Sequence, residues 1–330
     1  MFSNQINQIF EKFIRENLYP KPEERAFISE KYHELKDTIL PSDIHVFRGG
    51  SYARGTANTP VWDLDVFCDL ENPTEYLPTL LQILQNAYKG RANIEEQTHS
   101  IGIYFWAHDE FSIDVVPVRK AKEMPKNEFK LYLYELPEFT KHSKKWRKAF
   151  YGSNAVSLSD PEGYREKALE VDGQSGWRFK KVVKFLKRWN YGMKQEVNDV
   201  DFISFKSFHL EEIIKRYYID NPSLWVGDAI VRFYNEGMNF LQEPQFLDRA
   251  AKLSGQHFYI DEYVRGISSE SKKKIQEYLT KWIEHMELVH ISSDSDVEDI
   301  ARRLLFMAVP RKELPKYTTV PKHSWAHFML

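Results

Sequence analysis

The 330-residue sequence has one cysteine, almost no net charge and no long apolar run. The lone Cys68 excludes an internal disulfide and a zinc site built from several cysteines, which suits a reducing compartment, so we expect a cytoplasmic protein. The 46 basic and 48 acidic residues leave a net charge of −2, so no global basic field is present to hold a long nucleic acid. No apolar stretch approaches the length of a membrane span and the first residues lack a secretory leader, so we expect a soluble protein without membrane contact.

Apolar and aromatic residues are plentiful by contrast. Hydrophobic residues make up 42% of the chain, with 22 Phe, 18 Tyr and 8 Trp, which supports a core of one large or two ordinary domains. The hydrophobic periodicity predicts two N-terminal helices and a mixed sheet backed by helices up to about residue 155, and an almost wholly helical remainder. The fold class is therefore α+β. The predicted strands cover 44–48, 61–68, 93–96, 101–106 and 111–118, with a short extra strand at 131–134. The predicted helices of the second half cover 161–170, 173–194, 203–218, 223–241, 268–289 and 293–308.

A glycine-rich stretch, Gly49-Gly50-Ser51-Tyr52-Ala53-Arg54-Gly55-Thr56, follows the first predicted strand. Glycines let backbone N–H groups approach phosphate oxygens, and Ser51 adds a hydroxyl. A short helix after the glycines would point its positive end at the same anion. The stretch therefore predicts a phosphate-binding turn.

Two acids follow on the next predicted strand. A period of two puts Asp63 and Asp65 on one face, while Leu64 and its apolar neighbours face the core. Two carboxylates side by side repel each other and suit a buried face only if a divalent cation lies between them. Asp114 stands alone in the apolar run 111–118 and is the natural third carboxylate, so the three aspartates predict a metal site.

An alternative interpretation makes the glycine stretch a surface turn and the two acids the solvated face of an edge strand. The apolar residues that flank the acids, Trp62, Val66 and Phe67 among them, argue against an edge strand.

The order of these residues resembles a known motif. Gly50-Ser51, eleven further residues, then Asp63-x-Asp65, then Asp114 on a later strand, is similar to the nucleotidyltransferases of the DNA polymerase β superfamily. The resemblance implies two Mg²⁺ ions, for which Mn²⁺ can substitute, with the first two aspartates bridging both ions and Asp114 on the acceptor side. It also implies that Gly50 and Ser51 bind the donor phosphates.

Two later segments resemble a subgroup of these enzymes. One predicted helix carries Lys180, Lys184 and Lys187 away from its apolar stripe, and a solvated lysine face is the ordinary interpretation of such a row. Its end, Lys187-Arg188-Trp189, resembles the helix with the triphosphate-binding lysine of 2'-5' oligoadenylate synthases and cyclic GMP-AMP synthase. The segment Ser207-Phe208-His209-Leu210 resembles a second segment of the same two enzyme families, in which the serine also contacts the triphosphate. We expect His209 to be a hydrogen-bonded helix residue and not a base.

Together the segments, over residues 40–215, resemble the bacterial CD-NTases. The resemblance implies a polymerase β-like catalytic core with bracing helices in 1–155 and a helical domain in 156–330 that closes the nucleotide cleft. It further implies template-independent joining of nucleoside triphosphates, ATP or others, into a cyclic di- or oligonucleotide messenger for anti-phage defence. A regulatory or effector protein encoded nearby is the expected partner. Activation by DNA is not expected, because one cysteine cannot build the zinc ribbon of the animal DNA sensor.

Two other function classes fit parts of the pattern. Archaeal CCA-adding enzymes add nucleotides to RNA 3' ends from a similar glycine and acid motif, but near-neutral charge and a short body argue against RNA binding here. A catalytically dead binding module is disfavoured because all three acids are present. No residue selects the bases, the linkage or the ring size.

Overall fold

The computed structural model describes residues 4–71, 73–97, 100–106, 111–126, 129–136, 157–254 and 258–289. These residues divide into two compact units. The sheet unit is formed by the described residues of 20–167 and 248–257, and the helical unit by those of 1–19, 168–247 and 258–321. Each unit has its own hydrophobic core.

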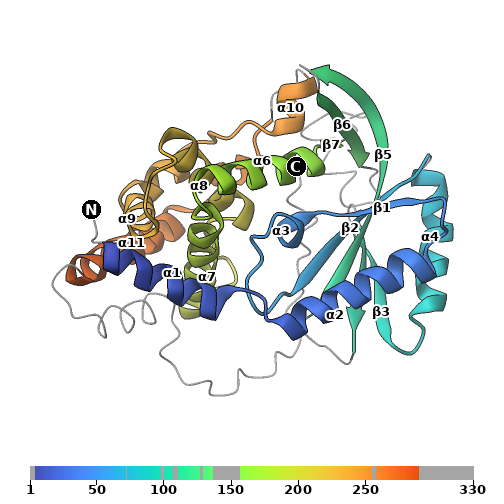
Figure 1. Cartoon of the computed structure of the whole chain (residues 1–330), viewed down its shortest axis with the longest axis horizontal. Coiled ribbons are helices and arrows are strands. Elements are labelled where there is room, and N and C mark those ends of the chain that lie inside the picture. Colours follow the sequence, from blue (N-terminus) through green and yellow to red (C-terminus); the bar gives the residue numbers. More distant parts are fainter. Residues whose placement is uncertain are drawn as a thin grey trace. The chain divides into compact units, whose positions relative to one another are not determined.

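The sheet unit is built on a mixed sheet, as the periodicity predicted (Figure 1). Its central strands run in the order β1 (His45–Arg48), β2 (Asp63–Asp69), β5 (Ser112–Lys126), β4 (Ile101–Phe105) and β3 (Ala92–Glu96). Off this path, β6 (Phe129–Leu136) pairs with β5 and with β7 (Ser157–Ser159). The pair β2 and β5 is parallel, whereas β1 with β2, β4 with β5 and β3 with β4 are antiparallel. The predicted strands are therefore confirmed, and the parallel pair lies in the middle of the sheet.

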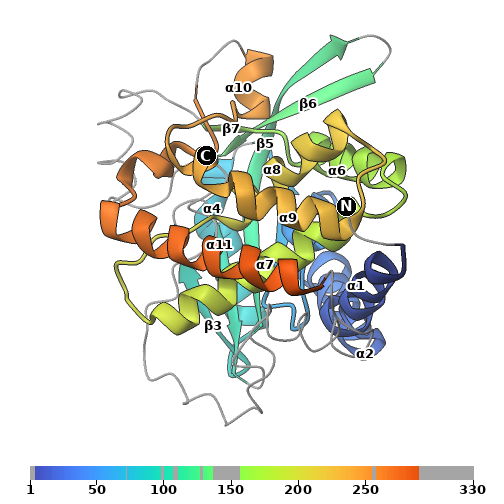
Figure 2. The same cartoon turned by 90° about the vertical axis from the view of Figure 1, so that its left-hand side faces the viewer.

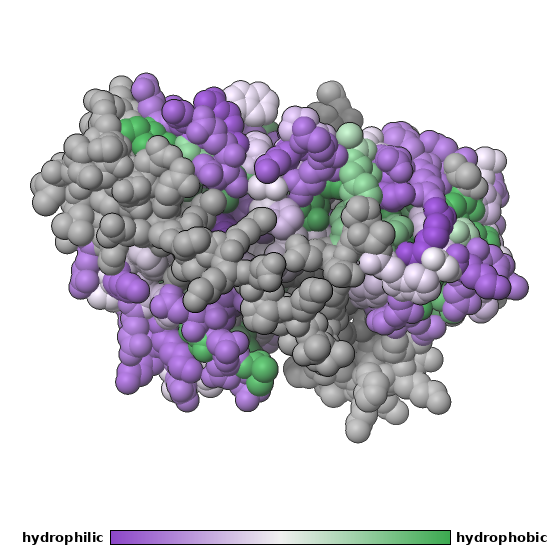
Figure 3. Space-filling model, turned by 90° about the horizontal axis from the view of Figure 1, so that it is seen from below, coloured by the Kyte–Doolittle hydropathy of each residue, from purple (hydrophilic) through white to green (hydrophobic). Residues whose placement is uncertain are grey.

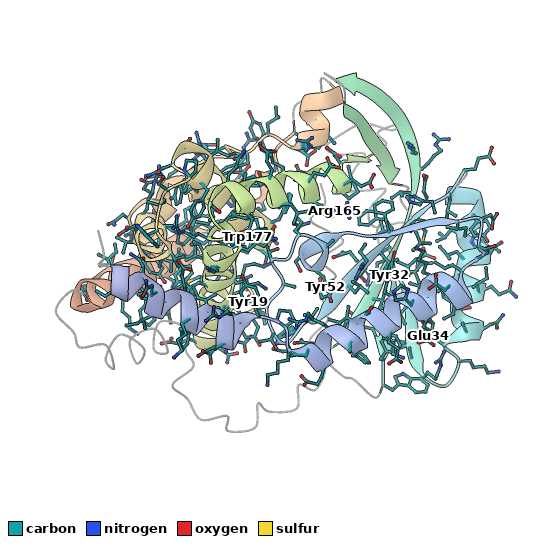
Figure 4. All side chains as sticks on the ribbon, viewed as in Figure 1. Tyr19, Tyr32, Glu34, Tyr52, Arg165 and Trp177 are labelled. Atoms are coloured by element: carbon teal, nitrogen blue, oxygen red, sulfur yellow. The ribbon has the colours of Figure 1, made fainter. Side chains whose placement is uncertain are left out.

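Helices cover one face of this sheet. They include α2 (Pro22–His33), the π-helix η1 (Glu34–Ile39) and α4 (Pro73–Ala87), whereas α3 (Gly50–Ala53) follows β1 and α10 (Arg249–Ser254) contacts β7. The core beneath the helices contains Leu64, Val66 and Cys68, all with 0% exposure. Tyr32, labelled in Figure 4, donates its hydroxyl hydrogen to the carbonyl of Val46 on β1 at 3.2 Å. The alternation predicted for β2 is thus confirmed, with its apolar side chains directed at the helices.

The helical unit packs around the indole of Trp189, which has 0% exposure. Its helices are α1 (Asn4–Leu18), the second half of α6 (Pro161–Gln174), α7 (Phe179–Val197), α8 (Ser207–Asp220), α9 (Val226–Glu236), η2 (Gly237–Leu241), η3 (Glu262–Gly266) and α11 (Ser269–Val289). Figure 2 shows α7, α9 and α11 side by side, and α9 contacts both of the others. Trp189 of α7 meets the rings of Phe233 and Tyr234 of α9 at 5.8 and 5.5 Å.

The first helix differs from the expected division of the chain. The predicted first domain included it, but α1 belongs to the helical unit. Phe10 meets Phe185 of α7 edge to face at 6.0 Å, and the buried Asn7 side chain accepts the N–H of Gly227 at 2.9 Å. The apolar stripe of α1 predicts a helix but does not identify its packing partner. The boundary predicted near residue 155 lies outside the described residues, and the two units divide within α6.

Several predicted helix bounds also change, and the helix predicted over 203–218, for example, is α8 and begins at Ser207. The helix predicted from 173 begins at Phe179, because Gly176 and Trp177 adopt left-handed φ angles of 61° and 64° that interrupt it. The helix predicted over 223–241 is α9 followed by the 3-10 helix η2. The helix predicted over 293–308 lies outside the described residues.

The described surface is mainly polar on the face shown in Figure 3, where hydrophobic side chains form small, separate areas. Among the residues that the structure describes, no helix is both long and apolar enough to cross a membrane.

Candidate functional site

The parallel pairing of β2 and β5 brings the three predicted aspartates to one face of the sheet. Asp65 is the register partner of Asp114, and Asp63 is the partner of Ser112. Neighbouring strands lie about 4.8 Å apart, and register partners point to the same face. Asp65 and Asp114 are buried, with exposures of 8% and 3%. The three carboxylates are therefore neighbours on the face opposite Leu64.

The glycine turn lies against one of these aspartates, Asp65. The N–H of Gly49 donates to the carbonyl oxygen of Asp65 at 2.9 Å. A Cβ atom added to Gly50 would lie 1.6 Å from Oδ2 of Asp65, and Gly50 has a left-handed φ of 60°. Any side chain at this position would displace the carboxylate and strain the backbone. The predicted phosphate-binding turn and the predicted acids thus belong to one site.

Ser51 lies at the second residue of α3, directly after these glycines, and is half-buried. Its carbonyl oxygen accepts the N–H groups of Thr56 and Ala57 at 2.9 and 3.1 Å, which closes the turn that follows α3. Tyr52, labelled in Figure 4, packs against the core of the sheet unit. The order of strand, glycine turn, short helix and strand that the motif requires is present.

The carboxylates repel one another at this site. Burial, followed by the negative charge of Asp63, raises the pKa of Asp114 to about 7, although a hydrogen bond from Gln97 acts in the opposite direction. A divalent cation would relieve this repulsion, so the chemistry of the donor set fits a metal that prefers oxygen ligands. In the part of the chain that the structure describes, no three His, Cys, Asp or Glu side chains are placed so that they could hold a metal ion together. The fit of a metal therefore rests on the oxygen donors of Asp63, Asp65 and Asp114 and on their common face of the sheet.

A glutamine that the sequence did not single out also reaches the site. The side-chain Nε2 of Gln97, in the turn after β3, donates to Oδ1 of Asp114 at 3.2 Å and to the hydroxyl of Tyr104 at 2.6 Å. Ser100 donates its hydroxyl hydrogen to Oε1 of Gln97 at 2.5 Å. One signal in the sequence could have pointed here: Gly102 interrupts an apolar strand directly opposite Asp114.

The lysine row of α7 is not a solvated face. Lys180 lies 3.0 Å from Asp172, and Lys187 lies 3.2 Å from Glu211, and both carboxylate side chains are 2% exposed. Lys184 is buried, and its ammonium nitrogen lies 4.5 Å from the centre of the Tyr19 ring. Figure 4 shows Tyr19 beside α7. The ordinary interpretation of such a row is therefore wrong in this helix, and Lys187 is held by a buried acid.

Ser207 is the first residue of α8 and is half-buried. Two residues on, His209 is buried, and its Nδ1 lies 2.8 Å from the hydroxyl oxygen of Tyr263. Burial lowers the pKa of His209 to about 3, so the ring is neutral at physiological pH. The expectation that His209 is a hydrogen-bonded helix residue is confirmed.

Lys187 and Ser207 lie in the helical unit, and the three aspartates, Gly50 and Ser51 lie in the sheet unit. Within the sheet unit, the structure brings the three aspartates, Gly50 and Ser51 together at one face of the sheet.

Comparison with known proteins finds both a domain match and similar structures. Residues 29–150 match the nucleotidyltransferase domain family. No curated protein matches the sequence. The fold is similar to that of CdnC of E. coli MS115-1 in a complex with HORMA-deltaN, with a TM-score of 0.66, 16% identity, and coverage of 92% of this chain and 97% of the other.

Two further structures are similar over nearly their whole length. The CdnE cyclic dinucleotide synthase of Elizabethkingia meningoseptica, solved with GTP and Apcpp, has a TM-score of 0.51 and 17% identity, with coverage of 87% of this chain and 99% of the other. The CD-NTase CdnG of Bradyrhizobium diazoefficiens, solved with GTP, has a TM-score of 0.54 and 12% identity, with coverage of 92% and 98%. At these identities the likeness concerns the fold, and the fold extends across both units.

Proposed function

We propose that this chain, which carries a nucleotidyltransferase domain within the CD-NTase fold, joins nucleoside triphosphates into a cyclic di- or oligonucleotide messenger and releases pyrophosphate. One observation carries the proposal: the parallel register places Asp65 beside Asp114 while the main chain of Gly50 lies against the Asp65 carboxylate. A metal-binding acid cluster beside a side-chain-free turn is what the transfer of a nucleotidyl group from a triphosphate requires.

Asp63, Asp65 and Asp114 are the proposed ligands of two Mg²⁺ ions, which Mn²⁺ can replace. When bound, the ions lower the pKa of an attacking hydroxyl and neutralise charge on the triphosphate. The acids themselves fix where the reaction takes place, because two strands of one sheet hold their main chains rigidly. Their mutual repulsion without metal supports the assignment.

The glycine turn is the proposed site for the phosphates of the donor nucleotide. A hydroxyl oxygen of the acceptor attacks the α-phosphorus and gives its proton to the Asp114 carboxylate, while the bond from the α-phosphorus to the α,β-bridging oxygen breaks and pyrophosphate leaves. Gly50 allows close approach of the main chain, and the Ser51 hydroxyl donates a hydrogen bond to the departing pyrophosphate.

Lys187 and Ser207, both in the helical unit, are proposed to bind triphosphate oxygens. Lys187 has a carboxylate partner, Glu211, at 3.2 Å. A triphosphate that binds Lys187 would therefore compete with Glu211 for the ammonium group or join it there. Before a triphosphate binds, Glu211 keeps the ammonium group of Lys187 oriented.

A protein partner is also proposed. The similar structure of CdnC is a complex with HORMA-deltaN. By analogy, the proposed partner of this chain is a regulatory protein, or an effector that responds to the nucleotide product, encoded nearby and acting with it in cytoplasmic defence signalling. Addition of such a partner is expected to change the rate of product formation and leave the product itself unchanged.

The decisive experiment incubates the purified chain with labelled triphosphates and a divalent metal, with and without tRNA, and then treats the products with phosphatase before mass analysis. A phosphatase-resistant nucleotide product formed without tRNA supports the proposal. Extension of tRNA 3' ends without such a product supports an RNA nucleotidyltransferase of the CCA-adding kind. The double variant Asp63→Asn, Asp65→Asn is the control, and pyrophosphate release at the wild-type rate in this variant contradicts the site assignment.

A further inference from the structure

Gln97 uses its whole amide to connect the third carboxylate to the rest of the sheet. Its Nε2 donates to Oδ1 of Asp114 at 3.2 Å and to the Tyr104 hydroxyl at 2.6 Å, and its Oε1 accepts the hydroxyl hydrogen of Ser100 at 2.5 Å. Ser100 has 0% exposure, so this contact is not replaced by bulk water. The ionised carboxylate of Asp114 fixes which end of the amide faces it, because a carboxylate only accepts hydrogen bonds, whereas the Ser100 hydroxyl can donate or accept.

A glycine makes room for this network. Gly102 on β4 is the register partner of Asp114 on β5. A Cβ atom at Gly102 would lie 2.5 Å from Nε2 of Gln97 and 2.7 Å from Cε2 of Tyr104. Without a side chain at this position, the amide can lie across β4 and reach the carboxylate on the next strand.

We propose that Gln97 is a positioning residue for Asp114: its amide, which lies over Gly102, holds Oδ1 and leaves the other carboxylate oxygen to serve a divalent cation. This inference rests on the proposed function, because it assumes that Asp114 is a metal ligand. The Asp114 carboxylate is 3% exposed and needs hydrogen-bond donors to remain ordered. Gln97, which lies between β3 and β4, supplies one such donor. Partners of this kind orient metal ligands, and their loss typically weakens metal binding about 10- to 100-fold.

The test measures binding of Mn²⁺ alone to the full metal-free chain, by the electron paramagnetic resonance signal of the free ion. Gln97→Leu keeps most of the side-chain volume and removes the amide, so the dissociation constant for Mn²⁺ is expected to rise about 10- to 100-fold. The matched control is Asn93→Leu. Asn93 is an exposed amide on β3 that bonds Glu95 at 2.7 Å, and its loss is expected to leave Mn²⁺ binding unchanged.

A second variant covers the case in which Gln97→Leu fails to fold. Gly102→Ala removes no polar group, but its added methyl group pushes the Gln97 amide away from Asp114, so it is expected to weaken Mn²⁺ binding by about 10-fold. Circular dichroism and thermal unfolding verify that each variant is folded at the temperature of the titration.

A double-variant cycle separates positioning from a general structural effect. In the Asp114→Asn background, Gln97→Leu is expected to cause no further loss of Mn²⁺ affinity. An equal loss in both backgrounds, or unchanged binding in folded Gln97→Leu and Gly102→Ala, overturns the role of Gln97 and leaves the proposed function standing. Equal Mn²⁺ binding by wild type and by Asp63→Asn, Asp65→Asn would instead overturn the carboxylate site, and both proposals with it.

Discussion

At the scale of single residues, the site depends on a position that must have no side chain. A Cβ atom at Gly50 would lie 1.6 Å from Oδ2 of Asp65. If Asp65 is a metal ligand as proposed, Gly50→Ala should displace its carboxylate by about an ångström and lower kcat by about 100-fold, the usual cost of misplacing a catalytic group by that distance. Initial rates of pyrophosphate release measure the effect.

Gly90→Ala is the control for the backbone contribution to this loss. Gly90 also has a left-handed φ, 74°, but an added Cβ would meet nothing within 4 Å. Both alanines strain the main chain, whereas only the one at Gly50 reaches a carboxylate. An equal loss of activity in the two variants would mean that backbone strain, and not the contact with Asp65, makes the glycine necessary.

Some site residues could be predicted from the sequence because they belong to a periodic pattern. Asp63 and Asp65 share a strand face by a period of two, and Asp114 stands out in an apolar run, so their common face follows from strand pairing alone. Gln97 could not be predicted in this way. It follows β3 in a turn, 17 positions before the carboxylate it bonds, and its contact depends on the pairing of β4 with β5. A polar residue in a loop carries no periodic signal that links it to a partner.

At the scale of elements, α7 presents two lysines in closely matched surroundings. Lys180 pairs with Asp172 and Lys187 with Glu211, and both acids are 2% exposed. Replacing either lysine with methionine removes a partner from a buried carboxylate and should lower the free energy of unfolding by about 1 to 3 kcal/mol. Only Lys187→Met should also lower kcat/KM for the triphosphate, by about 10- to 100-fold, because only that lysine is assigned to the phosphates.

Urea unfolding and steady-state kinetics on the two variants separate these effects. Equal kinetic losses at both positions would reduce Lys187 to a structural residue of α7, with its ion pair as its whole role.

The start of α8 contains a lysine whose charge should make stability depend on pH. Burial, and then the nearby charge of Lys194, lower the pKa of Lys206 to about 7. Its pKa in the unfolded chain is about 10.4, so between these values the unfolded chain binds a proton that the folded chain lacks. The contribution of this residue to stability therefore increases as the pH rises from about 7 to about 10.

Lys206→Met removes that dependence. The variant should be more stable than wild type at pH 7, by about 1 to 2 kcal/mol after allowance for solvent screening, and the difference should shrink toward pH 10. Denaturant unfolding at pH 7 and pH 9.5 measures it. Lys273→Met, on the exposed side of α11, should show no such trend. A stability difference for Lys206→Met that is the same at both pH values would contradict the predicted titration.

The elements themselves were largely predictable, but their partners were not. The strand order follows no local pattern, and the apolar stripe of α1 gives no sign that Phe10 packs on Phe185 of α7. A row of lysines such as that in α7 is ordinarily interpreted as a solvated face, because a helical pattern describes one element in isolation. Acids on other segments, Asp172 and Glu211, decide the environment of two of those lysines, and they come together with α7 only in the folded unit.

At the scale of the whole molecule, the fold is shared with CdnC over 92% of this chain at 16% identity. So low an identity means that the common fold is carried by patterns of burial and by a few fixed positions, and not by the bulk of the side chains.

The net charge of the chain leads to the last prediction, that it forms its product from free triphosphates and a divalent metal with no added nucleic acid. With 46 basic and 48 acidic residues, the molecule has no overall positive field to retain a polyanion, whose binding would release counterions and fall steeply with salt. A single acid cluster can form successive bonds only if the first product returns its own hydroxyl to the acceptor position, so short products should be released or closed into rings early.

The rate of product formation at saturating triphosphate should accordingly change less than about twofold between 50 and 200 mM salt, whereas a tRNA-dependent reaction should lose orders of magnitude in affinity over that range. Phosphatase-resistant product measured at both salt concentrations tests this. A purified chain that is inactive with all four triphosphates until tRNA is added, and whose activity then falls with salt, would identify an RNA 3'-end nucleotidyltransferase instead.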